Sequence, residues 1–239
     1  MQDILKLIEE RQSSRAPFDA KHPIAIKDLI QILEAGSWAP TAHNMQNFEI
    51  IVIDDKKLLK KIGNIKSQTS EVFLKENYQQ LSFSVEEFLQ KKFGLLGTMF
   101  PESWRNPEEL EKIASNSSPS SLSNTIKNSP TVLIVVYDTR KRAPASEGDF
   151  LGIMSLGCVM ENMWIMAASL GIGFQIMSVF GAEAIEKEIK QILNIPEYLK
   201  IAFASRLGYP SSKESKYLRV RRDVKNFTHH NKFGSKYLI

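Results

Sequence analysis

Residues 39–53 read APTAHNMQNFEIIVI, and this stretch joins a polar loop to an apolar run. The run Phe48–Ile53 is β-branched and nearly continuous, and two aspartates close it, which is typical of a buried strand. The loop before it places a proline, a hydroxyl and several amides between a predicted helix end and that strand. The stretch therefore predicts a core strand that is entered through a polar loop.

Three further strands and four helices are predicted around this strand. Short apolar runs bounded by turn residues predict strands over 132–136, 172–180 and 201–207. Apolar residues at helical spacing predict helices over 1–11, 26–35, 147–170 and 182–193. Because helices and strands alternate, we expect a single α+β domain over residues 1–239, with a basic C-terminal tail at 213–239.

Residues 66–125 do not fit that alternation. The segment 72–93 has a helical pattern, whereas 94–125 carries two glycines, Pro101, Pro107 and the stretch SNSSPSSLSN. We interpret 94–125 as a loop or a mobile cover. Two roles stay open for the whole segment, a tolerated surface insertion and a lid over a binding site.

The composition favours an ordinary globular protein. Of 239 residues, 43% are hydrophobic and 24% are charged, which allows a full core and excludes general disorder. The first residues show no secretory pattern, so we expect a cytoplasmic protein. The apolar tract 150–170 holds Glu161 and Asn162 in its middle, which favours a buried core helix over a membrane span. Trp38 and Trp164 are expected to pack in the core.

Charged and metal-ligating residues exclude some function classes. With one cysteine and four scattered histidines, a metal site is not expected. The net charge is +4, yet residues 213–236 hold eight Lys and Arg against two acids. Such a tail favours one bound anionic group over a nucleic-acid surface. A non-enzymatic module that binds nucleic acid or an acidic partner through this tail is the alternative that stays open.

Two short segments carry groups that suit a phosphate-bearing ligand. The chain has no P-loop, no nucleophile elbow and no complete dinucleotide fingerprint, so side chains must hold any phosphate. The segment Arg11–Arg15 offers two guanidiniums and two hydroxyls, although it is also typical of a solvated helix end. The loop 39–48 offers amides that match the edge of a flavin pyrimidine ring, or else ordinary Asx-turn chemistry.

Together these segments resemble the opening of the nitroreductase-like FMN enzymes. The pattern R-x-S-x-R stands at 11–15 and A-P-T-x-x-N-x-Q at 39–46, and LGYP at 207–210 and RVR at 219–221 follow in order. The resemblance spans residues 8–233 except for 66–125. It implies a nitroreductase-like α+β fold, in which helices flank a mostly antiparallel central sheet and a central helix forms a homodimer.

The resemblance also implies which residues bind FMN. Arg11, Ser13 and Arg15, with Gln12 standing where a second arginine is frequent, would face the flavin phosphate, ribityl chain and pyrimidine edge. Arg219 and Arg221 would close on the phosphate, with Arg222 as an alternative to Arg221. Thr41, Asn44 and Gln46 would reach the flavin across the dimer interface, and the backbone near Ser178 would lie beside its N5. Asn47 departs from the pattern, since proline is common there.

The reaction implied by the resemblance needs no catalytic side chain. Hydride would pass from NAD(P)H to FMN and then to a small electrophilic acceptor such as a nitroaromatic or a quinone, with ping-pong kinetics. A dehydrogenase, a dehalogenase or a flavin-cleaving enzyme of the same fold is the alternative. The sequence does not distinguish NADH from NADPH, and it does not identify the acceptor.

Overall fold

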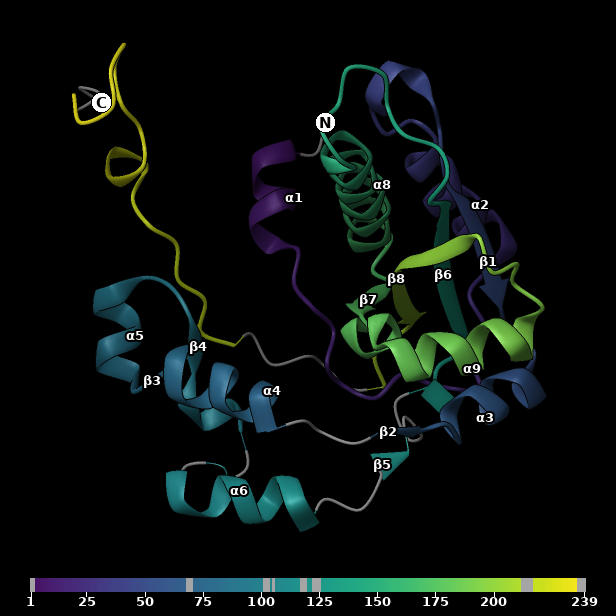
Figure 1. Ribbon diagram of the computed structural model, residues 1–239, viewed down its shortest axis with the longest axis horizontal. Coiled ribbons are helices and arrows are strands. Elements are labelled where there is room, and N and C mark those ends of the chain that lie inside the picture. Colours follow the sequence, from purple (N-terminus) through teal and green to yellow (C-terminus); the bar gives the residue numbers. More distant parts are fainter. Residues whose placement is uncertain are drawn as a thin grey trace. The chain divides into compact units, whose positions relative to one another are not determined.

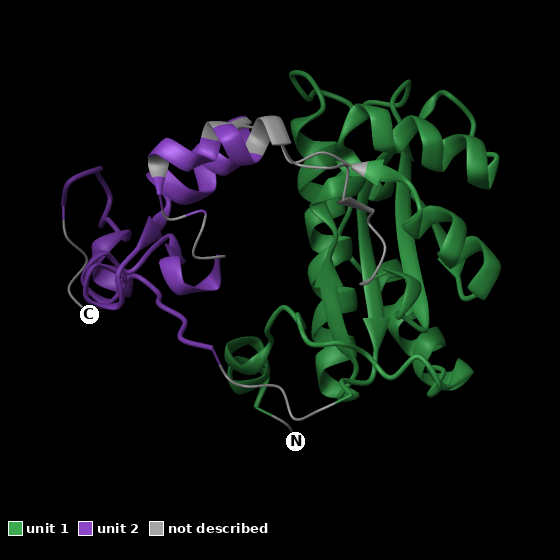
Figure 2. Cartoon of the chain, turned by 90° about the horizontal axis from the view of Figure 1, so that it is seen from below, with its two compact units in different colours: residues 1–67, 121–214 green, residues 68–120, 215–239 purple. Residues whose placement is uncertain are grey.

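The computed structural model describes residues 3–67, 71–100, 104, 106–116, 120–121, 126–211 and 217–235 (Figure 1). The chain forms two compact units (Figure 2). Unit 1 consists of residues 1–67 and 121–214, and unit 2 consists of residues 68–120 and 215–239.

A four-stranded sheet is the centre of unit 1. Its strands lie in the order β1 (Glu49–Ile53), β6 (Thr131–Asp138), β8 (Leu199–Gly208) and β7 (Gly173–Ile176). All three neighbouring pairs are antiparallel, with Glu49 opposite Val136 and Gly173 opposite Gly208. The prediction of an α+β fold with a mostly antiparallel sheet is confirmed.

Helices cover both faces of this sheet (Figure 1). One face packs against α3 (Lys56–Gly63) and α9 (Glu183–Leu193), and the other packs against α2 (Ile26–Ser37) and α8 (Phe150–Ser169). Successive residues of β6 alternate between the two cores, because Ile134 belongs to the first and Val135 to the second. Double burial explains the continuous apolar run in this strand.

Helix α8 is buried along one side only. The buried side chains recur at helical spacing and are Leu156, Val159, Met163 and Ala167. By length and composition α8 could cross a membrane, but a single such helix is weak evidence for a membrane protein. The expectation of a buried core helix is confirmed for this side only, because Ile153 and Met154 are more than half exposed.

Trp38 is also not a core residue. It directly follows α2, and 85% of its surface is exposed, because α2 buries the face that carries Ile32 and Gly36. Trp164, by contrast, packs against the core and stacks on Phe174 with ring centroids 5.5 Å apart. The expectation was wrong for the first tryptophan and is confirmed for the second.

Unit 2 contains more regular structure than expected. Its elements are α4 (Glu71–Lys75), a π-helical turn (Glu76–Gln80), β3 (Ser82–Phe83), α5 (Val85–Lys91), β4 (Leu95–Leu96) and α6 (Pro107–Asn116). The prediction of a single helix over 72–93 was therefore wrong. Ser84 starts a new helix through a capping box with Glu87, which breaks the expected one. The loop assigned to 94–125 is interrupted by β4 and α6.

Candidate functional site

The segment that follows α1 (Ile4–Glu10) runs beside β7 without forming a helix. The Ser14 amide donates to the Phe174 carbonyl at 3.0 Å, and the Ser14 side chain is buried. Ser13 is half-buried and Arg15 is exposed. Residues 11–18 are the segment expected to face the cofactor (the cofactor segment). Their backbone is therefore fixed at Ser14, while the neighbouring Arg15 reaches solvent.

The first residue of the cofactor segment contacts α8. Arg11 Nε lies 3.1 Å from Glu161 Oε1, and the guanidinium carbon lies 4.3 Å from the Trp164 ring centroid. Trp164 Nε1 also donates to the Gln12 carbonyl at 3.3 Å. Helix α8 thus holds Arg11 in a half-buried position, and a phosphate at this residue would compete with the Glu161 carboxylate. Its role as a phosphate ligand stays a prediction.

The polar loop before β1 brings Thr41, Asn44 and Gln46 together. The Gln46 amide donates to Thr41 Oγ1 at 3.2 Å, and Gln46 Nε2 donates to Asn44 Oδ1 at 3.1 Å. His43, Asn44 and Gln46 have φ of 51°, 52° and 45°, in the left-handed region. A residue other than glycine in such a conformation costs roughly 1–3 kcal/mol, so the surroundings must stabilise the loop.

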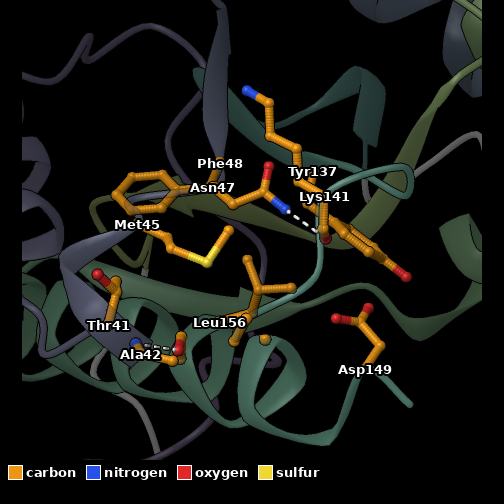
Figure 3. A pocket seen from close by; sticks show the side chains of 12 residues that line it. Thr41, Ala42, Met45, Asn47, Phe48, Tyr137, Lys141, Asp149 and Leu156 are labelled. Atoms are coloured by element: carbon orange, nitrogen blue, oxygen red, sulfur yellow. Dashed lines mark hydrogen bonds between the residues drawn. The ribbon is translucent and has the colours of Figure 1, made fainter. Parts of the chain in front are cut away.

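Asn47 supplies part of that stabilisation (Figure 3). Its Nδ2 donates to the Asp138 carbonyl at 3.0 Å and to the Lys141 carbonyl at 3.4 Å, and its Oδ1 accepts from the Asp138 amide at 3.2 Å. The loop is also fixed to α8, because the Ala42 amide donates to Ser155 Oγ at 3.0 Å. A proline at position 47 could form none of the side-chain bonds.

The end of β6 is itself held by an ion pair. Arg140 Nε and Nη2 donate to the two Asp138 carboxylate oxygens at 2.9 and 2.8 Å, and the guanidinium carbon lies 3.6 Å from the Tyr198 ring centroid. The hydrogen bonds from Arg140 hold the pKa of Asp138 at about 2, below its ordinary value of 3.8. This pair stabilises the strand end that anchors Asn47.

The loop lines a small, partly open pocket (Figure 3). Its mostly apolar walls include Thr41, Phe48 and Leu156. Tyr137 contributes a polar group, and burial raises the pKa of its phenol, as do the carboxylates of Asp149 and Glu186. The Tyr137 hydroxyl therefore stays protonated at neutral pH and can donate a hydrogen bond.

The other predicted site residues lie elsewhere in the two units. Ser178 is exposed and begins the 3-10 turn η5 (Ser178–Gly181) shortly after β7 in unit 1. Arg219 and Arg221 belong to unit 2, where Arg221 Nη1 donates to the Val220 carbonyl at 2.8 Å. The Arg222 guanidinium carbon lies 5.4 Å from the Phe227 ring centroid. Lys213, Lys216 and Lys236 of the basic tail lie outside the described residues.

Residues 8–209, most of the chain, match the family model described as the Nitroreductase family. The chain belongs to this family. A protein of Archaeoglobus fulgidus, provisionally named NADH dehydrogenase/NAD(P)H nitroreductase, is 24% identical over 217 residues, which are 91% of each chain. Iodotyrosine deiodinase of Thermotoga neapolitana is 22% identical over 92% of this chain and 95% of its own.

Solved structures support the same fold for this nitroreductase-family chain. A nitroreductase with bound FMN from Bacteroides fragilis superposes with a TM-score of 0.59 and 21% identity, over 95% of this chain and 98% of its own. At this identity the likeness concerns the fold. In the described part of the chain, no group of three or more His, Cys, Asp or Glu could hold a metal ion.

The Asp138–Arg140 pair gives this nitroreductase-family protein an expected acid sensitivity. Because the folded-state pKa is depressed, the carboxylate stabilises the fold fully above about pH 4, and this contribution is lost as the pH falls toward about 2. The Arg140→Gln variant should be less stable than wild type near neutral pH and approach it in strong acid. Urea unfolding at a series of pH values measures the difference.

Lys141→Gln is the matched control, because it removes the adjacent positive charge, which only weakly lowers the pKa of Asp138. Its stability should follow the pH dependence of wild type. If the deficit of Arg140→Gln stayed constant down to pH 2, Arg140 would act through its stacking on Tyr198 and not through the carboxylate.

Proposed function

We propose that the chain is an FMN-dependent oxidoreductase that transfers reducing equivalents from NAD(P)H to a small electrophilic acceptor, such as a nitroaromatic or a quinone. The observation that carries the proposal is the strained polar loop, in which Thr41, Asn44 and Gln46 converge in left-handed backbone. Strain of this kind is concentrated at binding sites, where it fixes groups for a ligand. Membership of the nitroreductase family gives that ligand its chemical class.

The residues present fit FMN. The cofactor segment offers guanidiniums at Arg11 and Arg15 and a hydroxyl at Ser13, which suit the phosphate, the ribityl chain and the pyrimidine edge. The strained loop offers amide groups for the ring edge. Arg219 and Arg221 on the basic tail add the charge that a phosphate dianion requires. Gln12 and the backbone at Ser178 complete the proposed set.

The protein's own contribution to the reaction is position and charge. Bound FMN would supply two-electron hydride chemistry. The exposed Arg15 guanidinium would lie at the pyrimidine edge and stabilise negative charge that develops there. The Thr41 hydroxyl and the amides of Asn44 and Gln46 would orient the ring. No side chain is required as a nucleophile in this assignment.

The protein is proposed to work as a homodimer in the cytoplasm. Helices α1, α2 and α8, together with Trp38 directly after α2, leave seven large apolar side chains more than half exposed, namely Ile4, Leu5, Ile26, Trp38, Phe150, Ile153 and Met154. An apolar surface of this kind marks an interface, and a second copy supplies a self-complementary partner. The strained loop would then reach the FMN of the partner subunit.

The domain assignment follows from the same proposal. The chain is one nitroreductase-like domain that carries an insertion at about 66–125 and a basic tail at 213–239. The basic tail holds the cofactor phosphate, so neither nucleic acid nor a membrane is a partner. For the insertion, both roles stay open, a tolerated surface insertion and a lid over a binding site.

Reductive dehalogenation is the second candidate. The similarity to iodotyrosine deiodinase over nearly the whole chain favours it. It would use the same cofactor site and differ in the acceptor. Turnover of a halogenated phenol together with failure of quinones and nitroaromatics would select this function.

Absorption and kinetics of the purified protein test the proposed function. We expect a yellow protein with flavin bands that anaerobic NAD(P)H bleaches before any acceptor is added. When donor and acceptor concentrations are varied, double-reciprocal plots should be parallel, since both substrates use one site in turn. A protein that stays colourless after FMN addition would exclude the function, and intersecting lines would exclude the ping-pong order.

A further inference from the structure

Arg206 is a cation buried in the centre of the sheet. It lies on β8, between β6 and β7, and only 1% of its surface is exposed. Nε donates to Oε1 of Gln175, the residue opposite it on β7, at 2.6 Å. Removing a guanidinium from water costs several kcal/mol, and an apolar side chain of similar volume would fill this space without that penalty. The cation must therefore form contacts that an apolar residue cannot form.

Those contacts are with the cofactor segment. Arg206 Nη2 donates to the Ser14 carbonyl at 3.0 Å and to the Ala16 carbonyl at 2.9 Å. The guanidinium carbon lies 4.2 Å from the ring centroid of Phe18. One nitrogen thus binds the backbone on both sides of Arg15, which itself is exposed. A shift of the segment by one residue would break both hydrogen bonds.

The cofactor segment also lies as close to β7 as its atoms allow. A Cβ added at Gly173 would lie 2.5 Å from Phe18 Cε1 and 2.8 Å from Ser14 Oγ. The Ser14 amide is bound to the Phe174 carbonyl on the same strand. Strand β7 therefore fixes how closely the cofactor segment approaches the sheet, and Arg206 fixes the register of the segment along it.

We propose that Arg206 is a positioning residue, which sets the register of residues 14–16 and thereby directs Ser13 and Arg15 toward the cofactor. The inference rests on the proposed FMN site. It assigns a function to a buried charge that does not itself touch the cofactor. The Ser14 and Ala16 carbonyls, one on each side of Arg15, are hydrogen-bonded to a residue of the central strand β8. The position of Arg15 therefore depends on the rigidity of the sheet.

The Arg206→Met variant tests the proposal against Lys190→Met. Lys190 is likewise a buried cation of unit 1, but its Nζ donates to the Glu197 carbonyl at 3.0 Å, beyond the end of α9. We expect Arg206→Met to raise the dissociation constants of FMN and of riboflavin by at least tenfold each, because Arg15 would contact the ring that both ligands share. Lys190→Met should change both less than twofold. If both substitutions changed the dissociation constants equally, Arg206 would contribute only to the general stability of the fold.

Hydrogen exchange without flavin gives a second, independent test. Arg206→Lys keeps the charge and one carbonyl bond but not the planar fork, so it should fold where the methionine variant fails. The amides of Ser14 and Asp19, which donate to Phe174 and Tyr209, should exchange at least tenfold faster, while β6 stays protected. Unchanged exchange of both amides would overturn the role of Arg206 in fixing residues 14–16. If both amides exchanged faster but FMN affinity stayed at the wild-type value, the role of Arg206 in cofactor binding would be overturned. A wild-type protein that binds no flavin would instead refute the proposed function.

Discussion

The Arg221→Ala variant should bind FMN roughly 10- to 150-fold more weakly than wild type, because a charge-assisted hydrogen bond contributes about 1.5–3 kcal/mol. Its affinity for riboflavin should stay within twofold, since riboflavin has no phosphate. Fluorescence titration of both ligands against the apoprotein measures the two dissociation constants. The ratio of the two losses separates a phosphate contact from a general effect on the fold.

Arg222→Ala is the matched control for that experiment. The Arg222 guanidinium lies over the Phe227 ring, whereas the Arg221 guanidinium donates to the preceding Val220 carbonyl. Removing Arg222 should therefore affect FMN binding little. If Arg222→Ala lost FMN selectively and Arg221→Ala did not, the phosphate contact would move to Arg222. Equal losses of FMN and riboflavin would mean that Arg221 acts through the structure of unit 2.

The Ile153→Glu variant should dissociate the proposed homodimer and lose FMN with it. Ile153 is a 58% exposed residue of α8, and in the proposed dimer a carboxylate there would be buried against the second subunit without a partner. Sedimentation velocity should give a species near 27.1 kDa in place of one about twice that mass. Because the strained loop would serve the partner's flavin, the separated subunits should be colourless.

Val52→Glu provides the comparison for this variant. Val52 is an exposed valine on β1, one of the two edge strands of the sheet, and not on α1, α2 or α8. Its substitution should leave both the dimer and the flavin in place. A monomeric Ile153→Glu protein that still held one FMN per chain would contradict a site built from two subunits.

The strands and long helices could be predicted because their signals are local. The run at 132–136 and the apolar spacing at 147–170 each lie within a few residues of β6 and α8. The helix expected over 72–93 failed for a local reason as well. Ser84 and Glu87 form a capping box, a start signal that the apolar spacing across it concealed.

The candidate site likewise contains residues that could be predicted from local sequence and residues that could not. Thr41, Asn44 and Gln46 are close in sequence, so their grouping could be recognised before their hydrogen bonds were known. Asn47 was recognised only as a departure, because the backbone that it binds is 91 residues away. Arg206 gave no signal at all, since its partners lie about 190 residues earlier in the chain and nothing in a short pattern marks a buried cation.

The order of the sheet has a consequence for chain length. Strands β1 and β6 are neighbours, although the segment 66–125 separates them in sequence. The entropy of closing a flexible loop grows only with the logarithm of its length, so each doubling costs about 0.6 kcal/mol. The junction between these two strands is therefore a place where the architecture can gain or shed tens of residues over evolution while the sheet stays folded.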